Sequence, residues 1–348
     1  MLPGGSFTVI PTIDLSLADD PTSEAGLLER LRHALVHVGF LYVVNHGVPE
    51  ETVSAVVGAL PTLFALPAAA KEEIALENFP HFLGYSGDGA ETTAGAVDRR
   101  EQWPSSYPDL RPIIEAYVSE MTLLGERFLR LVAKALSLPP EAFLPFLSDQ
   151  HRLKLVRYPA LPECEAAGGG QGVGPHKDSS GWWTFLLQAS PPVGGLQALN
   201  KDGGWVDVPA LPGSFVVNIG QAFEVVTGGV CKATTHRVLS GPLERFSVPF
   251  FQGVRRDLTK DEAVGSLGAH FGRPEIRGRL AAESTEGRTV DSAFLQGKYD
   301  TWGESQLRTK IRSHRSVGKK FYAEVFDRNE KRDVSCTWML PPGFIHWF

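Results

Sequence analysis

The sequence predicts a mainly β fold with flanking helices, α+β overall, built as a single domain over residues 1–348. Two observations predict this class. Between residues 151 and 256, short apolar runs follow one another and are separated by Gly, Pro, Asn and Asp, which is typical of antiparallel strands joined by turns. On either side of this segment, apolar residues recur at helical spacing. We therefore expect a sandwich or barrel with helices around it.

The N-terminal part, residues 1–150, is expected to be mostly helical with one early strand. The segment SEAGLLERLRHALVHVGF places leucines and a valine on one helical face, and FLYVVNHG is a β-rich run that ends in turn residues. The segment PEETVSAVVGALPTLFAL opens with proline and two acids, a helix start that Pro61 should bend or break. Residues 110–137 form the longest amphipathic pattern.

The central part, residues 151–256, is expected to contain the strands. Its apolar runs are LKLVRYP, WWTFLLQ, GGLQAL, WVDVP, GSFVVNIG, THRVL and RFSVPFFQG. The glycine-rich EAAGGGQGVG (165–174) is interpreted as a flexible lead-in to the first candidate site. The C-terminal part, residues 257–348, returns to a helical pattern and is expected to pack on the core.

Composition excludes several classes of function. The net charge is −6, with acids and bases mixed and no basic patch interleaved with aromatics, so a nucleic-acid partner is not expected. No apolar stretch approaches the roughly 20 residues that span a membrane, and the first residues do not resemble a secretory signal. Three scattered cysteines indicate a reducing compartment, so we expect a cytoplasmic protein. The oligomeric state is not indicated.

A candidate metal site begins in the stretch VGPHKDSSGWWTFLLQ. His176 and Asp178 are one residue apart, and on a strand such positions share a face. His236 stands at the start of another β run, 58 residues after Asp178. Two histidines and one carboxylate, with other positions open, form the facial set of non-haem Fe(II) chemistry. A chance pairing and another divalent metal remain alternatives.

A candidate carboxylate clamp follows in RFSVPFF. Arg245 and Ser247 are two residues apart, and therefore on one face of a strand. A guanidinium binds a carboxylate through two parallel hydrogen bonds, and a hydroxyl completes the clamp. Facing an apolar interior, the pair would require an anionic partner. The alternative is that Arg245 pairs with an internal acid or lies on the outer face.

Together these motifs resemble the 2-oxoglutarate/Fe(II)-dependent dioxygenase superfamily, and more narrowly its isopenicillin N synthase-like branch. The order His176-x-Asp178, His236, Arg245-x-Ser247 is joined by VIPTIDLS, GFLYVVNHGVPEE, RYP, GGLQAL, WVDVPALPGSFVVNIG and ATTHRVLSGPLERFSVPFF. The resemblance runs from about residue 8 to 255. PHFLGYSGDGAETTAGAVDRREQW and GPHKDSSGWWTFLLQ look most like fungal natural-product members. It implies a double-stranded β-helix, the jelly-roll fold.

The resemblance also implies the chemistry. His176, Asp178 and His236 would bind Fe(II), while 2-oxoglutarate would chelate the iron and place its 5-carboxylate on Arg245 and Ser247. Tyr158 would donate a hydrogen bond to this cosubstrate, or is a core tyrosine. With O2, such an enzyme oxidises a C–H bond of a small specialised metabolite or modified amino acid by hydroxylation, desaturation, ring closure or rearrangement, releasing succinate and CO2.

The substrate pocket is expected to take apolar walls from the strands and polar groups from the segment near residue 100. Strand alternation allows either Trp182 or Trp183 to face the cavity, but not both. An inward-facing arginine from Arg99 or Arg100 would favour an acidic substrate; otherwise both are solvated. The helix with Arg308, Arg312 and His314 is interpreted as a lid or as simple packing. The predicted pocket residues are Trp182, Phe185, Leu187, Phe250, Phe251, Tyr85 and Arg99.

Two departures from the pattern of relatives have structural consequences. Thr184 and Gln188 come one position later than in many relatives, which predicts a bulge or longer turn near Gly181. Gln221 stands where an aspartate is common, and we interpret that position as structural. Two alternative functions also fit the motifs. One is an oxidase like isopenicillin N synthase, which uses no 2-oxoglutarate, and the other is a non-catalytic jelly-roll binding protein.

Overall fold

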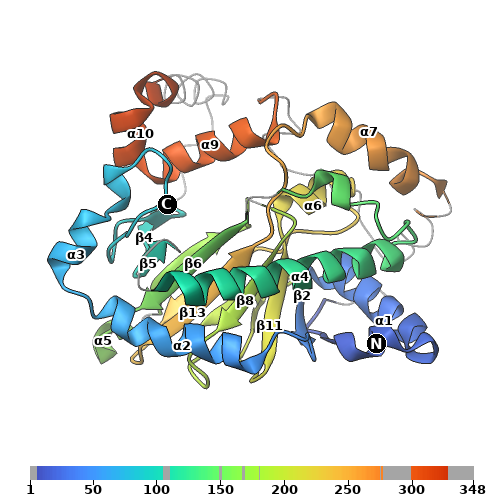
Figure 1. Cartoon of the computed structure of the whole chain (residues 1–348), viewed down its shortest axis with the longest axis horizontal. Helices are drawn as coiled ribbons and strands as arrows, with labels where there is room; N and C mark the ends of the chain where they lie inside the picture. The colour runs from blue at the N-terminus through green and yellow to red at the C-terminus, as the bar shows by residue number, and fades with distance from the viewer. Residues whose placement is uncertain are drawn as a thin grey trace.

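Two β-sheets form the centre of the computed structural model, which describes residues 6–104, 110–148, 151–166, 169–179, 181–274, 276 and 299–327 (Figure 1). The larger sheet has the strand order β1-β2-β11-β8-β13-β6-β5 and the smaller one β10-β9-β12-β7. All pairs are antiparallel except β1 with β2. The predicted fold class, a jelly-roll core in an α+β protein, is confirmed. In chain order, the sheet strands are β1 (Thr12–Asp14), β2 (Phe40–Val44), β5 (Glu101–Pro104), β6 (Arg152–Tyr158), β7 (Gly170–His176), β8 (Trp183–Gln188), β9 (Leu196–Leu199), β10 (Trp205–Asp207), β11 (Ser214–Ile219), β12 (His236–Ser240) and β13 (Arg245–Phe251).

The period of two along the strands separates the core from the cavity. On β13, Val248 and Phe250 are fully buried in the main apolar core, whereas Arg245 and Ser247 line a cavity between the sheets. Above the core face lies α4 (Arg111–Ala135), which crosses the larger sheet in Figure 1. The ring of Phe128 on α4 packs edge-on against two aromatic rings of β8. Helix α4 therefore covers one face of the larger sheet, and the opposite face lines the cavity.

The remaining helices flank the sheets. The predicted early helix is present as α1 and is extended by a π-helical turn (Ala34–Val38), and the early strand is β2. Short 3-10 segments span Leu15–Asp19, Leu76–Asn78 and Leu144–Phe146, and a small hairpin pairs β3 (Thr92–Thr93) with β4 (Ala96–Val97). The helices are α1 (Pro21–His33), α2 (Glu50–Phe64), α3 (Ala68–Glu73), α4, α5 (Glu163–Ala166), α6 (Gln221–Val226), α7 (Lys260–Phe271), α9 (Trp302–Ser313) and α10 (Arg315–Phe321).

Two expectations about local structure were wrong. Helix α2 continues through Pro61 to Phe64, because this proline lies in the last turn and its neighbours Leu60 and Leu63 are buried. The glycine-rich segment before His176 is not a flexible lead-in, since Gly170–His176 forms strand β7 and pairs with β12. A Cβ at Gly172 would lie 2.9 Å from both Ser240 Oγ and Tyr158 Cδ1. The glycine thus allows neighbouring strands to approach closely.

In Figure 1, α9 and α10 lie above the strands of the larger sheet, and residues of α9 line the cavity. Helices α9 and α10 pack on the segment after α3 through a small apolar cluster that includes Phe82, Ile311 and Val317. Part of the predicted helical C-terminal part, residues 277–298 and 328–348, lies outside the described residues. Among the described residues, no helix has the length and apolar character needed to cross a membrane.

Gly181 lies in the turn that was expected near this position, between β7 and β8. Its φ of +93° is in the left-handed region, and an added Cβ would lie 2.3 Å from the carbonyl oxygen of Gln252. We predict that Gly181→Ala lowers the free energy of unfolding by about 2 kcal/mol or more, because backbone strain and a backbone clash combine. Denaturant unfolding checks this. Gly26→Ala is the control, since nothing lies within 4 Å of its added Cβ inside α1; a similar loss in both variants would contradict the prediction.

Candidate metal and cosubstrate site

The two candidate histidines come from neighbouring strands of the smaller sheet. His176 is the last residue of β7 and His236 the first of β12, and the two are paired in the strand register. Each Nδ1 lies within hydrogen-bond distance of a backbone carbonyl oxygen, Gly174 O at 2.9 Å and Thr234 O at 3.1 Å. With Nδ1 protonated, each ring presents an unprotonated Nε2 to the same space. This is the form of imidazole that binds a metal.

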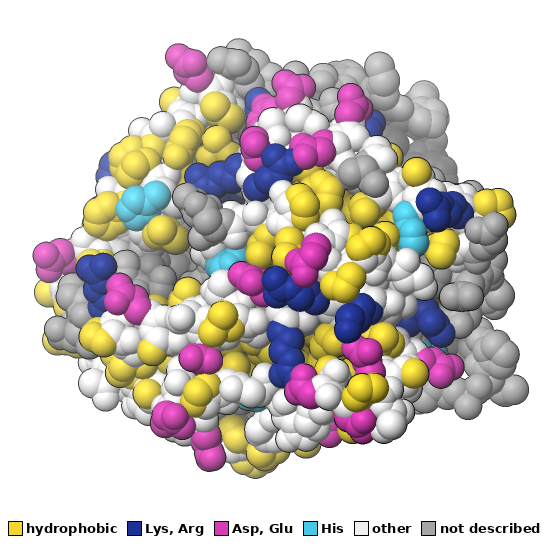
Figure 2. Space-filling model, turned by 45° about the vertical axis from the view of Figure 1, so that its right-hand side comes forward, with side chains coloured by type: hydrophobic (Ala, Val, Ile, Leu, Met, Phe, Trp, Pro, Cys, Tyr) yellow, Lys and Arg dark blue, Asp and Glu magenta, His cyan; other side chains and the backbone are white. Residues whose placement is uncertain are grey.

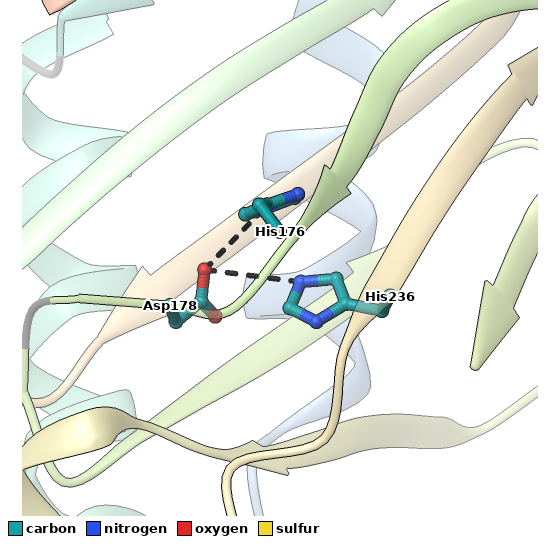
Figure 3. Close-up of side chains that lie close together, drawn as sticks. All are labelled: His176, Asp178 and His236. Atoms are coloured by element: carbon teal, nitrogen blue, oxygen red, sulfur yellow. Dashed lines mark ion pairs between the residues drawn. The ribbon is translucent and has the colours of Figure 1, made fainter. Parts of the chain in front are cut away.

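Asp178 completes the group, although not by the strand geometry that was expected. Strand β7 ends at His176, and Asp178 lies in the following loop, where its carbonyl oxygen accepts a hydrogen bond from Gln221 N at 2.8 Å. Its Oδ1 is 3.6 Å from His176 Nε2 and 3.8 Å from His236 Nε2 (Figure 3). One ligand atom from each of the three residues lies within 4.8 Å of the others. The three side chains therefore converge on one point.

The second carboxylate oxygen of Asp178 is held by two neighbouring strands. Thr184 Oγ1 on β8 donates a hydrogen bond to Oδ2 at 2.5 Å, and Asn218 Nδ2 on β11 donates one at 2.7 Å. Thr184 and Asn218 face each other in the strand register. Both donors act on the same oxygen, so Oδ1 remains directed at the histidines.

The electrostatics favour the protonation states that a metal requires. Burial alone would raise the pKa of Asp178, but the charges of His236 and His176 and the hydrogen bonds from His176 and Thr184 hold this pKa well below its usual value. Burial, together with the charge of His176, lowers the pKa of His236 to about 4. At neutral pH, Asp178 is therefore ionised and His236 neutral. A carboxylate and unprotonated imidazoles are the donor set of a divalent cation such as Fe(II).

Arg245 lies deeper in the same cavity, at the start of β13. Its side chain is buried, and Nη2 donates a hydrogen bond to Gln188 Oε1 at 3.1 Å. The Nε and Nη1 atoms are buried without a hydrogen-bond partner among the described residues, and no described acid forms an ion pair with this guanidinium. Burial lowers the pKa of Arg245. An incoming carboxylate would satisfy the free donors and offset the buried charge.

Ser247 and Tyr158 complete this end of the cavity. Ser247 is buried two residues after Arg245 and lines the cavity with it. Tyr158 pairs with Arg245 in the register of β6 and β13, and its ring centroid is 4.9 Å from the Arg245 Cζ atom. Tyr158 also packs in the apolar cluster between the sheets. The structure thus places all three predicted cosubstrate residues along one wall.

The cavity has a volume of about 440 Å³ and joins the two candidate sites. Residues from both sheets line it, and so do side chains of the β3–β4 hairpin and of α9. Gln306 of α9 also donates a hydrogen bond to the carbonyl oxygen of Ser179, one residue after Asp178. Helix α9 therefore forms part of the cavity lining and contacts the loop that carries Asp178.

Most of the predicted apolar walls face the other way. Three predicted pocket residues belong instead to the main core, under α4 and its neighbours: Trp182, Phe185 and Leu187. The prediction that they line the pocket was wrong. Trp183 is also in that core, so neither tryptophan faces the cavity. The β8 residues that line the cavity are Thr184 and Leu186, the opposite strand parity. Phe251 lines the cavity as expected, whereas Phe250 is in the core.

The two neighbouring arginines at residues 99 and 100 lie in different places, one at the surface and the other in the cavity lining. Arg99 is partly exposed and bonded to Asp88, so its expected place in the pocket is corrected. Arg100 lines the cavity and lies 2.5 Å from Glu91 and 3.3 Å from Asp98. Tyr85 is outside the cavity lining and donates a hydrogen bond to Glu101 at 2.8 Å, so its predicted pocket role is corrected as well.

Sequence reasoning missed a set of polar cavity residues. Arg152 and Lys154 on β6, together with Lys310 on α9, line the cavity. The sequence could have indicated the two residues of β6, because Arg152 and Lys154 are separated from Tyr158 by an even number of positions and so lie on the same face of the strand. His314, the residue that follows α9, lines the cavity, whereas on α9 Arg308 pairs with Glu304 and Arg312 is exposed. Thr184, Asn218 and Gln188 were also missed as partners of the predicted site residues.

Comparisons with known proteins agree with this geometry. Residues 10–115 match the family model described as non-haem dioxygenase in morphine synthesis N-terminal, and residues 150–254 match that of the 2OG-Fe(II) oxygenase superfamily. The chain is 40% identical to the 2-oxoglutarate-dependent dioxygenase frbJ of Dothideomycetidae sp. (strain 11243), over 92% of this chain and 94% of that protein. It is 33% identical to the 2-oxoglutarate-dependent dioxygenase traH of Penicillium crustosum, over 70% and 83% of the two chains.

Solved structures show the same fold. The structure of JOX2 in complex with 2OG, Fe and JA has a TM-score of 0.62 at 29% identity and covers 72% of this chain and 76% of that one. The structure of the dioxygenase for auxin oxidation in rice has a TM-score of 0.64 at 27% identity and covers 83% and 99% of the two chains. This chain therefore shares its fold with two oxygenases, one of which was solved with 2OG and Fe.

Proposed function

Since the chain belongs to the 2-oxoglutarate/Fe(II)-dependent oxygenase superfamily and is an oxidoreductase that uses Fe(II), 2-oxoglutarate and O2, we propose that His176, Asp178 and His236 bind its Fe(II). The observation that carries this proposal is the convergence of one ligand atom from each of the three residues within 4.8 Å, with Asp178 Oδ1 3.6 and 3.8 Å from the two Nε2 atoms. Three protein ligands leave positions open for a cosubstrate and oxygen.

We further propose that Arg245 and Ser247 hold the 5-carboxylate of 2-oxoglutarate, with Tyr158 donating a hydrogen bond to it. The two buried, unpartnered nitrogens of Arg245 support this role, because an incoming carboxylate would accept hydrogen bonds from the guanidinium and offset its buried charge. When bound, iron would activate O2, which is the oxidant, and 2-oxoglutarate would be oxidised to succinate and CO2. The protein residues orient the cosubstrate and exclude water from the site.

The substrate is a small molecule, and we propose a specialised metabolite or modified amino acid. The two fungal relatives named above support this choice. The scattered cysteines of the sequence support a cytoplasmic location. Hydroxylation, desaturation, ring closure and rearrangement all remain outcomes of the same site, because the position of the substrate carbon decides among them.

Anaerobic binding followed by turnover tests the proposal. Fe(II) and then 2-oxoglutarate are titrated into the metal-free protein, and the visible absorption of the complex is followed. We expect 2-oxoglutarate to bind only after iron, and succinate to form when oxygen is admitted. Substrate oxidation without succinate would instead support an oxidase like isopenicillin N synthase, and a protein that fails to bind iron would contradict the proposed function.

A prediction concerns the residues that orient Asp178. Thr184→Val removes one of the two hydrogen bonds to Oδ2 at nearly constant volume, so we expect Fe(II) affinity to fall about 10- to 100-fold. Calorimetric metal titration measures this. Thr309→Val is the matched control, since Thr309 lines the same cavity but its hydroxyl donates to Ser305 O within α9. Unchanged iron affinity in Thr184→Val would show that Asn218 alone orients the carboxylate.

A further inference from the structure

The cavity contains a second cationic group, separate from Arg245. Arg152 and Lys154 project from β6 on the face that also carries Tyr158, and Lys310 projects from α9 into the same space. Tyr158 is beside Arg245, and Lys154 is four residues away along the strand, a distance of about 13 Å. The second group therefore lies away from the proposed 2-oxoglutarate clamp, on the part of β6 that carries Arg152 and Lys154.

These three cations have little compensation within the protein. No described residue forms an ion pair or a hydrogen bond with the side-chain nitrogens of Arg152, Lys154 or Lys310. Lys310 Nζ lies over the Phe82 ring, 5.7 Å from its centroid. The neighbouring carboxylate of Glu91 is 2.5 Å from Arg100 and 3.3 Å from His314. The acid is thus already bonded to other partners.

The pKa shifts agree with an uncompensated cluster. Burial, and then the charges of Arg100 and Arg152, lower the pKa of Lys154 to about 8, against the opposing charges of Glu91 and Asp178. Burial lowers the pKa of Arg152 to about 10, and burial with the charges of Arg152 and Lys154 lowers that of Lys310 well below its usual value. On the face shown in Figure 2, by contrast, acidic and basic side chains are interspersed.

We propose that Arg152, Lys154 and Lys310 form the substrate-anchoring site, and that they bind the carboxylate of an organic acid. The anion would replace the missing counter-charge and direct the rest of the substrate inward. Leu186, Val238 and Phe251 also line the cavity and would contact an apolar body. This inference rests on the proposed function of the neighbouring iron site, since it supplies the substrate class for that chemistry.

Paired probes test the carboxylate directly. The anaerobic Fe(II) holoenzyme is first saturated with 2-oxoglutarate, so that Arg245 is occupied. It is then titrated with hexanoate and with phenylacetate, and each acid is compared with its primary amide. Phenyl phosphate is titrated as a further probe. Binding is followed by the paramagnetic broadening of the ligand proton signals. We expect both acids to bind at least about 10-fold more tightly than their amides, because charge-assisted hydrogen bonds are lost in the amide.

Substitutions locate the binding group. Lys154→Met and Lys310→Met should weaken acid binding about 10- to 100-fold and leave the amides unaffected. The matched control is Arg312→Met, which removes an exposed cation from the same helix as Lys310. Lys154→Met should also leave the metal-free protein as stable as the unmodified one or more so, because an uncompensated charge is removed. A loss of stability would instead indicate a structural partnership with Glu91.

The outcomes separate the two proposals. A protein that does not bind Fe(II) and 2-oxoglutarate would contradict the proposed function. A holoenzyme that binds both, but binds acids no better than amides or retains acid binding in Lys154→Met, would overturn only the anchoring site. Failure of both acids to bind this intact holoenzyme would overturn it as well. Tighter binding of phenyl phosphate than of either acid would overturn the assignment to a carboxylate.

Discussion

Asp178→Ala is expected to lower the rate of 2-oxoglutarate-dependent turnover by about 10³-fold or more. The change removes the only anionic ligand of the proposed Fe(II) site, and a metal ion contributes several kcal/mol to transition-state stabilisation. The two histidines alone would hold the cation weakly, since each is neutral. Succinate formation under saturating 2-oxoglutarate measures turnover, and anaerobic iron titration measures the accompanying loss of affinity.

The folded state should survive this substitution. Asp178 lies in a loop after β7, so its side chain is not part of the apolar core. Circular dichroism and thermal unfolding of the metal-free variant are therefore expected to resemble those of the unmodified protein. Asp207→Ala is the control, since this aspartate is exposed on β10 and its carboxylate accepts from Gln197 at 2.8 Å. Iron binding that persists in Asp178→Ala would remove Asp178 from the ligand set.

Arg245→Met is expected to weaken 2-oxoglutarate binding by about 30- to 1000-fold, or 2–4 kcal/mol. The variant cannot donate the hydrogen bonds that the unpartnered guanidinium nitrogens offer, and it removes the charge that faces the 5-carboxylate. Calorimetric titration of the anaerobic Fe(II) protein with 2-oxoglutarate measures the effect. Iron affinity should change little, because Arg245 does not belong to the metal-binding group.

Two further variants make this test specific. Arg237→Met is the control, because this arginine of β12, in the smaller sheet, stacks on Trp205 at 4.1 Å and donates to Gln197. Arg245→Lys should recover only part of the affinity, since an ammonium group cannot form two parallel bonds. If Arg245→Met bound 2-oxoglutarate as the unmodified protein does, the clamp assignment would be wrong and the cosubstrate would have to lie elsewhere in the cavity.

Together with the resemblance it supports, the sequence was sufficient for the architecture and for the enzyme family. Period-two alternation with turn residues marked most core strands, and period-3.6 patterns marked α1, α2 and α4, because each pattern reflects which side chains a regular element must bury. The spacing of Arg245 and Ser247 also predicted correctly that both face one side of β13. These features are local, so they are determined by residues that are close together in the sequence.

The tertiary structure decided which face of each strand meets the cavity and which distant groups meet there. The alternation of side chains does not by itself determine which of the two sets of β8 residues faces α4. Phe185 and Leu187 were therefore predicted to lie on the wrong side of the strand. The orientation of Asp178 depends on hydrogen bonds from β8 and β11, and the cationic group depends on α9 bringing Lys310 to Lys154 from a distant part of the chain. Such contacts follow from packing between elements rather than from the periodicity within one.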